Sequence, residues 1–173
     1  MAIPLNQDPL MIQRMEESLV ANCRAALAAH ETIDSVVYGI FSLDDMEKLQ
    51  EGELGEKIAV GVGYLGSQPS SAVGGSQYNG EGGLGGKTID FTFMAMLAVP
   101  ANDQVPRRYD AGAILSILKF YTMGAAVEDG RTQRPWMFVQ EKPEIADSTR
   151  TMLYYSQLWR VTIPIVAQPR PNP

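Results

Sequence analysis

Apolar residues recur at helical spacing in two segments of the chain, 8–29 and 108–127. In the first segment they are Leu10, Met11, Met15, Leu19, Ala26 and Leu27. In the second they are Ile114, Leu115, Leu118 and Tyr121. Asp8 and Asp110 precede the two runs as plausible N-caps, and Gly124 is expected to break the second. The pattern predicts two amphipathic helices.

Other segments alternate or are rich in β-branched and aromatic residues, which is typical of strands. The alternation is cleanest in 88–100, where Pro100 closes the run. Shorter β-type runs occupy 34–41 and 57–65. Segments 135–145 and 149–166 are two further predicted strands joined by a charged turn, and 149–166 alternates over a longer distance. The pattern predicts an antiparallel pair.

Most of the 16 glycines fall between Gly61 and Gly86, and two nucleotide-binding motifs have near matches there. Gly61, Gly63 and Gly66 fit G-x-G-x-x-G, but no helical pattern follows to direct a helix N-terminus at a pyrophosphate. In a P-loop, G-x-x-x-x-G-K-[ST], that ends at Lys87 and Thr88, Glu81 would occupy the position of the first glycine. A β-type run would follow the motif in place of the required helix. A nucleotide-binding enzyme therefore stays only as an alternative.

The glycine tract is better interpreted as a long loop between two strands that orders against another protein chain. Tyr78 is its only aromatic anchor, and Val73 and Leu84 are lesser apolar contacts. The final segment, at about 167–173, contains alternating prolines and is expected to form an extended arm.

Composition excludes several classes of function. A net charge of −6 and an isoelectric point near 4.8 argue against a protein that grips nucleic acid. Cys23 and His30 are the only residues of their types, so we expect no disulfide, no metal site, no catalytic pair and no cofactor. The start lacks a signal-peptide pattern, and no apolar run approaches the roughly 18 residues that span a membrane. One soluble, intracellular domain covering 1–173 is expected.

Two clusters of side chains are candidate interaction sites. Segment 44–56 predicts a short helical turn followed by a loop, and it carries an acidic cluster formed by Asp44, Asp45, Glu47, Glu51, Glu53 and Glu56. The spacing of an EF-hand is absent, so a solvated acidic face is favoured over a cation site. Tyr154, Tyr155 and Trp159 occur on both faces of one predicted strand, so some should be exposed, and with Arg160 they suggest a protein interface.

The order of elements resembles the tail terminator proteins of long-tailed bacteriophages, especially those of Mu-type phages and related prophages. Four stretches carry the resemblance: LMIQRMEESLVANCRAAL, TIDFTFMAMLAV, DAGAILSILKFYTM, and PWMFVQEKPEI followed by YYSQLWRVTIPI. The resemblance implies an α+β fold with two main helices packed on a mostly antiparallel sheet. It also implies a structural, non-enzymatic protein of the virion tail, made in the host cytoplasm.

The resemblance further implies a ring of six copies that caps the tail tube, ends its polymerisation and joins the head connector. The expected partners are copies of the chain itself, the tail tube protein and a head–tail connector protein, with no membrane. DNA would pass through the lumen without specific binding, and the acidic cluster would face that lumen or a neighbouring subunit. Another connector component, a head-closure or tail-completion protein, is the alternative of the same class.

Overall fold

The structure, a computed structural model, describes residues 8–30, 33–40, 44–45, 57–70, 87–100, 111–128, 133–144 and 152–165. Its helices are α1 (Met11–Ala28) and α3 (Ala111–Thr122). Its strands are β1 (Ser35–Gly39), β2 (Ile58–Pro69), β3 (Lys87–Pro100), β4 (Ala126–Glu128), β5 (Gln133–Pro135), β6 (Met137–Glu144) and β7 (Met152–Ile165).

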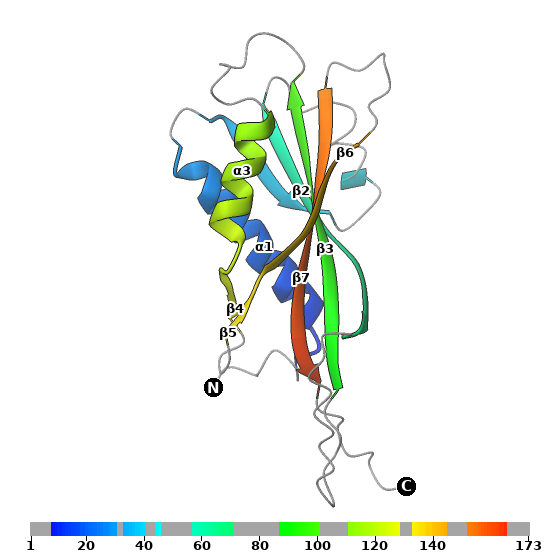
Figure 1. Ribbon diagram of the computed structural model, residues 1–173. Coiled ribbons are helices and arrows are strands. Elements are labelled where there is room, and N and C mark those ends of the chain that lie inside the picture. The colour runs from blue at the N-terminus through cyan, green and yellow to red at the C-terminus, as the bar shows by residue number, and fades with distance from the viewer. Residues whose placement is uncertain are drawn as a thin grey trace, which may run out of the picture.

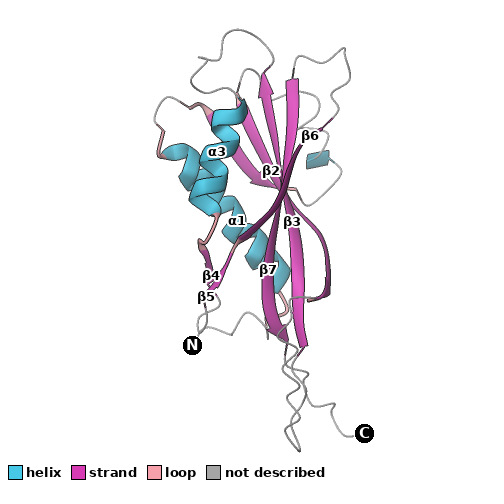
Figure 2. Ribbon diagram, viewed as in Figure 1, coloured by secondary structure: helices cyan, strands magenta, loops and turns pink. Residues whose placement is uncertain are grey.

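The two helices lie on the same side of a five-stranded sheet of order β1-β2-β3-β7-β6 (Figure 1). Only the β1–β2 pair is parallel, and all other neighbours are antiparallel. β3 and β7 pair over their whole length, from Lys87 opposite Ile165 to Pro100 opposite Met152, and form the centre of the sheet (Figure 2). The protein is therefore an α+β protein with two helices on a mostly antiparallel sheet, which confirms the expected fold class.

The main core lies between the helices and the sheet. Alternate residues of each central strand point to the helices, and the register sets Phe93 of β3 directly opposite Trp159 of β7. Met15 and Leu19 of α1 and Ile114 of α3 close the core from the helix side. Large apolar side chains that are fully buried contribute about 1.5–3 kcal/mol each, so this layer accounts for most of the packing energy.

Trp159 and Tyr154 are both buried, so the expectation of an exposed aromatic strand is wrong for these two residues. Trp159 has no exposed surface and packs edge-to-face on Phe138, with ring centroids 5.5 Å apart. Tyr154 points to the other face of the sheet, where it packs with two alanines, Ala59 and Ala98, in a second small cluster. The alternation along the strand correctly placed the two residues on opposite faces of the sheet. Both are nevertheless buried, Trp159 in the main core and Tyr154 in the second small cluster.

Arg160, the third residue of that predicted interface, is partly exposed and lies on the sheet face away from the helices. Its guanidinium is 3.5 Å from a carboxylate oxygen of Asp90, a residue with no exposed surface. Thr162 donates a 2.6 Å hydrogen bond to the other oxygen of Asp90. Arg160 therefore satisfies a buried carboxylate across the β3–β7 pair, whatever else its exposed part contacts.

The segment between α3 and β6 contains a hairpin that the sequence pattern did not reveal. The helix ends at Thr122, and Gly124, with φ of 84°, adopts the left-handed conformation that favours glycine, which confirms the expected break. β4 and β5 then pair, and Trp136 is buried edge-to-face on Phe93, with 5.4 Å between the ring centroids. The strand predicted over 135–145 therefore begins only at Met137.

α1 begins at Met11, one turn later than the predicted segment, and its N-cap is Leu10, which makes no side-chain capping bond. Asp8 is buried instead, where its carboxylate accepts a 2.9 Å hydrogen bond from the Leu10 amide and pairs with Arg14. Asp8 thus stabilises the turn before the helix rather than acting as the expected N-cap. The N-cap predicted at Asp110 lies outside the described residues.

Glu16 is an acid on the buried side of α1, with an exposed fraction of 4%. Its Oε1 atom has no hydrogen-bond partner within the described part of the chain. Burial, and to a smaller extent the charge of Glu17, raises the pKa of Glu16 from 4.5 to about 7. A buried carboxylate with an unsatisfied oxygen destabilises the isolated subunit when it is ionised.

The substitution Glu16→Gln is expected to remove a pH dependence of stability. Because folding raises this pKa, the folded subunit binds the proton more tightly, so the free energy of unfolding is highest below pH 4.5 and falls until about pH 7. One pKa unit corresponds to about 1.4 kcal/mol, so the difference between 4.5 and about 7 predicts a fall of about 3 kcal/mol. Urea unfolding at several pH values measures it. The exposed Glu17→Gln variant is the control and should keep most of the dependence, because the charge of Glu17 is the smaller cause of the raised pKa. An unchanged slope in Glu16→Gln would contradict the prediction.

Candidate assembly surface

Large apolar side chains are exposed on the outer face of α3. Phe120 is 73% exposed and Tyr121 50% exposed, and Met123 follows them just beyond the end of the helix. Contiguous apolar side chains that a subunit leaves in water are typical of surfaces that bind another protein. We call Ile117, Phe120, Tyr121 and Met123 the α3 surface.

The α3 surface exists because this helix is apolar around most of its circumference. Its sequence, AGAILSILKFYT, contains a single charged residue, Lys119. The core takes up only one stripe, formed by Ile114, Leu115, Leu118 and Thr122. Tyr121, which was predicted in that stripe, lies at its edge because Thr122 is the residue one turn after Leu118. A helix that is hydrophobic all round needs cover on its outer side too.

Polar contacts hold α3 in one orientation on the sheet. Gln157 of β7, which is buried, donates one 2.8 Å hydrogen bond to the carbonyl oxygen of Leu115 and another to Glu141 of β6. Lys119 of α3 pairs with the same Glu141 oxygen at 3.2 Å and lies 4.9 Å from the centre of the Phe138 ring. Because these contacts set the rotation of the helix, they also set which side chains face outward.

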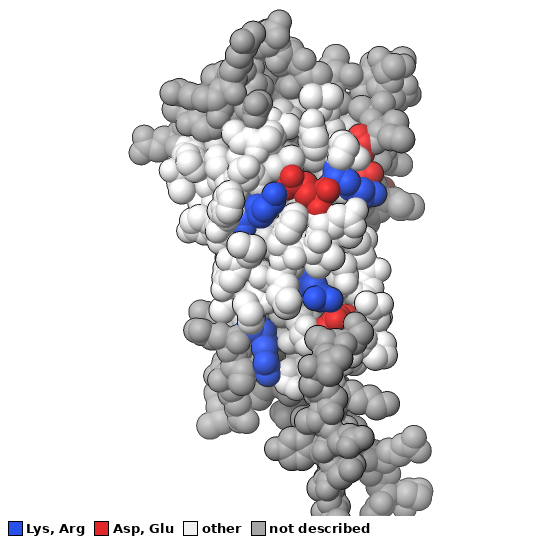
Figure 3. All heavy atoms as spheres, in the orientation of Figure 1, with Lys and Arg blue, Asp and Glu red and all other residues white. Residues whose placement is uncertain are grey.

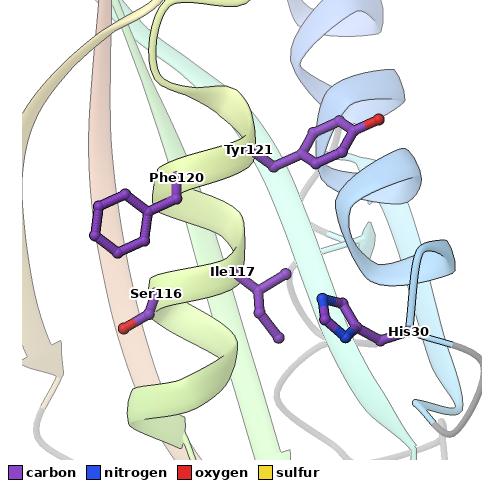
Figure 4. A pocket seen from close by; sticks show the side chains of 5 residues that line it. All are labelled: His30, Ser116, Ile117, Phe120 and Tyr121. Atoms are coloured by element: carbon purple, nitrogen blue, oxygen red, sulfur yellow. The ribbon is translucent and has the colours of Figure 1, made fainter.

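The α3 surface borders an open hollow of about 380 Å³ between α3 and the end of α1, lined by His30, Ser116, Ile117, Phe120 and Tyr121. In Figure 4, Ile117 and Tyr121 point from α3 toward the α1 side, where His30 faces Ile117, and Phe120 points to the other flank. Ser116 donates a 2.8 Å hydrogen bond to the carbonyl oxygen of Gly112 in the previous turn. A serine hydroxyl that donates to a backbone carbonyl is not paired with a base that would activate it as a nucleophile. Because Ile117, Phe120 and Tyr121 form most of the lining, the hollow is suited to binding an apolar side chain.

Charges of both signs lie side by side on the face seen in Figure 3, and most of the described surface over α3 is uncharged. Lys142 and Glu144 of β6 form one such pair at 3.1 Å. Ser156 donates a 2.6 Å hydrogen bond to Glu144 and, with Lys142, lowers the pKa of that acid. Among the residues described on this face, no basic patch of the kind that binds nucleic-acid phosphates is seen.

Two members of the predicted acidic cluster are described. Asp44 and Asp45 are helical, as expected, and Asp44 is exposed. Burial, followed by the charge of Asp45 and the hydroxyl of Tyr154, raises the pKa of Tyr38 to about 12, so Asp45 lies near the second small cluster, on the sheet face away from the helices. The other members, Glu47, Glu51, Glu53 and Glu56, lie outside the described residues.

The glycine motif lies within a strand. Gly61, Gly63 and Gly66 all belong to β2, which continues to Pro69 with an irregularity between Tyr64 and Gly66. In the dinucleotide-binding motif a helix begins at the third glycine, and its N-terminus faces the pyrophosphate. Here the chain continues as a strand past Gly66, and the described residues up to Ser70 contain no such helix. Lys87 and Thr88 likewise begin β3 and not a helix. The predicted loop contacts Val73, Tyr78 and Leu84 lie outside the described residues.

Within the described ranges, no group of three or more His, Cys, Asp or Glu side chains is placed to hold a metal ion. None of the helices described is long and apolar enough to cross a membrane. Cys23 is buried in the main core, and burial raises the pKa of its thiol to about 12 despite a hydrogen bond with Thr122. It behaves as a small core residue.

The α3 surface was not identified from the sequence, although a signal was present. The segment ILSILKFYTM offers apolar residues on more sides of a helix than one sheet can cover. The interpretation concentrated on a single stripe and assigned Tyr121 to it. Counting the apolar residues left over after that stripe, Phe120 and Met123 among them, would have indicated a second contact surface.

Comparisons with known proteins gave matches among solved structures only. No protein-family model and no curated protein matches the chain. One similar chain is from the virion of a native gene transfer agent particle, with 14% identity, a TM-score of 0.45 and coverage of 84% of this chain and 91% of that chain.

Another similar chain is from the sheath/tube terminator, in the extended state, of an extracellular contractile injection system. It has 15% identity and a TM-score of 0.49, and the match covers 91% of this chain and 57% of that chain. The present chain thus spans little more than half of that protein. One of these similar chains thus belongs to a virion and the other to a sheath/tube terminator.

Proposed function

We propose that this protein is a structural subunit of a phage-like tail, which assembles into a ring, caps the tail tube and ends its polymerisation. The resemblance of the sequence to phage tail terminator proteins is the basis for proposing this class of structural protein. The observation that carries the proposal is the α3 surface, because a single subunit leaves Phe120 and Tyr121 half exposed or more. Assembly would bury these side chains against another chain.

A ring requires two different patches on each subunit, because every head-to-tail contact joins unlike surfaces. The α3 surface is one candidate, and Leu10 and Ile12, which are exposed at the start of α1, are the second. Six copies, the number that the resemblance implies, would close the ring. The acidic cluster at Asp44 and Asp45 would face the lumen or a neighbour, where repulsion keeps passing DNA from binding.

The proposal also assigns roles to parts of the chain outside the described residues. The glycine-rich loop, with Val73, Tyr78 and Leu84, would order against the tube protein or a neighbouring subunit. The head connector would bind the opposite face of the ring. The protein would act through these contacts alone, without catalysis, and would reside in the virion tail.

Electron microscopy of particles that lack the protein tests the function directly. Tails of uncontrolled length are expected, because nothing would stop tube polymerisation. Tails of normal length that fail to join heads would instead support a head-closure or tail-completion role. Mass measurement of the purified protein, alone and with tail tubes, should show a ring at the tube ends; a monomer that never associates with tubes would overturn the proposal.

Titration with ATP and NAD tests the alternative from another class. A nucleotide-binding enzyme that uses the glycine tract would bind one of them with micromolar affinity. We expect no binding, because Gly61, Gly63 and Gly66 are part of a paired strand that no helix follows as far as Ser70. Micromolar binding of either nucleotide would overturn the structural role proposed here.

A further inference from the structure

A second hollow, of about 470 Å³, lies along the first turns of α1 and is lined by Pro9, Leu10, Ile12, Gln13 and Glu16. Its rim is apolar, because Leu10 is 52% exposed and Ile12 is also exposed. Its polar lining residues are Gln13 and Glu16, and Glu16 is the ionisable one. We call this hollow the α1 pocket.

Glu16 is almost fully buried, and its Oε1 atom has no hydrogen-bond partner among the described residues. Neighbouring groups that could serve are already engaged. Arg14 pairs with Asp8, and the amide of Gln13 donates a 2.9 Å hydrogen bond to Glu17. A buried acceptor without a partner is rare in folded proteins, and it indicates a donor from outside the described part of the chain. The raised pKa of Glu16 has the same origin.

An apolar rim around a buried carboxylate matches one type of ligand. The ligand needs a cationic donor on an apolar stem, flanked by apolar residues that can lie on Leu10 and Ile12. An arginine satisfies this requirement best, because its planar guanidinium offers several donors to one carboxylate. Prolines beside it would provide the apolar contact without a backbone donor that needs a partner of its own.

The chain itself contains such a segment at its end, where VAQPRPNP places Arg170 between Pro169 and Pro171. β7, which precedes it, ends at Ile165. In Figure 1 this end of β7 and the start of α1 lie at the same end of the molecule. Prolines at alternate positions favour an extended chain, which advances by about 3.1 Å per residue and does not turn back sharply. We expect an extended arm of this kind to run away from its own subunit and toward a neighbouring copy.

We propose that the arm formed by residues 166–173 of one copy binds the α1 pocket of a neighbouring copy, with Arg170 paired to Glu16. The contact deepens the ring function proposed above and rests on it for the presence of a neighbour. Leu10 and Ile12 would pack on the flanking prolines.

A synthetic peptide of residues 165–173 tests the recognition step, with protein that lacks residues 166–173. In NMR titrations, the peptide should shift the amide signals from Leu10 to Glu16. A peptide with Arg170→Gln, or protein with Glu16→Gln, should bind at least 10-fold more weakly. The exposed Glu17→Gln variant is the control and should bind normally. No shifts, shifts confined to other residues, or binding that is insensitive to Glu16→Gln would overturn the proposal.

Cysteine cross-linking of the full chain decides which copy supplies the arm. Gln13→Cys and Pro171→Cys in the same chain should form disulfides between copies, seen as covalent dimers and higher species on a non-reducing gel. Cys23 does not interfere, because it is buried in the core. Fast-migrating monomers, with the bond inside one chain, would overturn the assignment to a neighbour.

The two proposals can fail separately. Peptide binding and cross-linking are measured on purified protein, and they report on the arm even if the ring serves another particle. Tail length is measured on particles and reports on the tube cap. Arm binding with normal tail lengths would overturn the terminator function alone, and uncontrolled tails without arm binding would overturn this inference alone.

Discussion

Replacing Phe120 by Asp should abolish assembly while leaving the subunit folded. Phe120 projects from α3 with 73% of its surface exposed, so the isolated subunit loses little packing. In an assembly the same position would be buried, and a carboxylate there would lose its hydration without gaining a partner. Buried aromatic anchors contribute about 2 kcal/mol or more to an interface, so association should weaken by at least about 30-fold.

Mass photometry over a range of concentrations measures this effect, and thermal unfolding measures the stability of the subunit. The melting temperature should change by no more than a few degrees, as is usual for exposed positions. Ala21→Asp is the matched control, because it places the same charge at an exposed position on α1. Normal assembly of Phe120→Asp would show that the α3 surface is not a subunit contact.

Replacing Trp159 by Ala should lower the free energy of unfolding by about 3–5 kcal/mol, a large part of the total stability of a domain. Trp159 has no exposed surface, and it lies opposite Phe93 and against Phe138 at the centre of the sheet. Alanine would leave a cavity that the paired strands cannot close. The indole Nε1 has no hydrogen-bond partner among the described residues, so Trp159→Phe should recover most of the loss.

Urea unfolding of dilute, monomeric protein measures these differences. Leu153→Ala is the control on the same strand, because Leu153 is exposed and should cost less than about 1 kcal/mol. A similarly small loss for Trp159→Ala would mean that this side chain is not buried in the subunit. It would also restore the interpretation of β7 as an exposed aromatic strand.

The periodic parts of the fold could be predicted from the sequence. The alternation of Ile89, Phe91 and Phe93 identified β3, and the apolar repeat around Leu118 identified α3, since burial on one face imposes the same spacing on sequence and structure. The β4–β5 hairpin was not predicted, because its paired segments are only three residues long and offer too few positions for a period to appear. The additional length of β2, to Pro69, arises from pairing with β3 and overrides the low strand propensity of its glycines.

The candidate sites depended on tertiary packing to a greater degree. Parity placed Tyr154 and Trp159 on opposite faces of β7, but only the tertiary structure shows that α1 and α3 cover one face and that Tyr154 packs with Ala59 and Ala98 on the other. The same packing leaves Phe120 outside and Glu16 inside. Whether a side chain is exposed depends on which segments pack against it, and these segments are often far away in the sequence.

The local order of apolar and polar residues was therefore sufficient for the two helices and the longer strands, because each of these elements is specified by the spacing of its own residues. The α+β class was an expectation from the family resemblance. Strand order, the parallel β1–β2 pair, the α3 surface and the α1 pocket were decided by the tertiary structure. Each of these features requires segments far apart in the chain to meet, and contacts of that kind are not encoded in the period of any single segment.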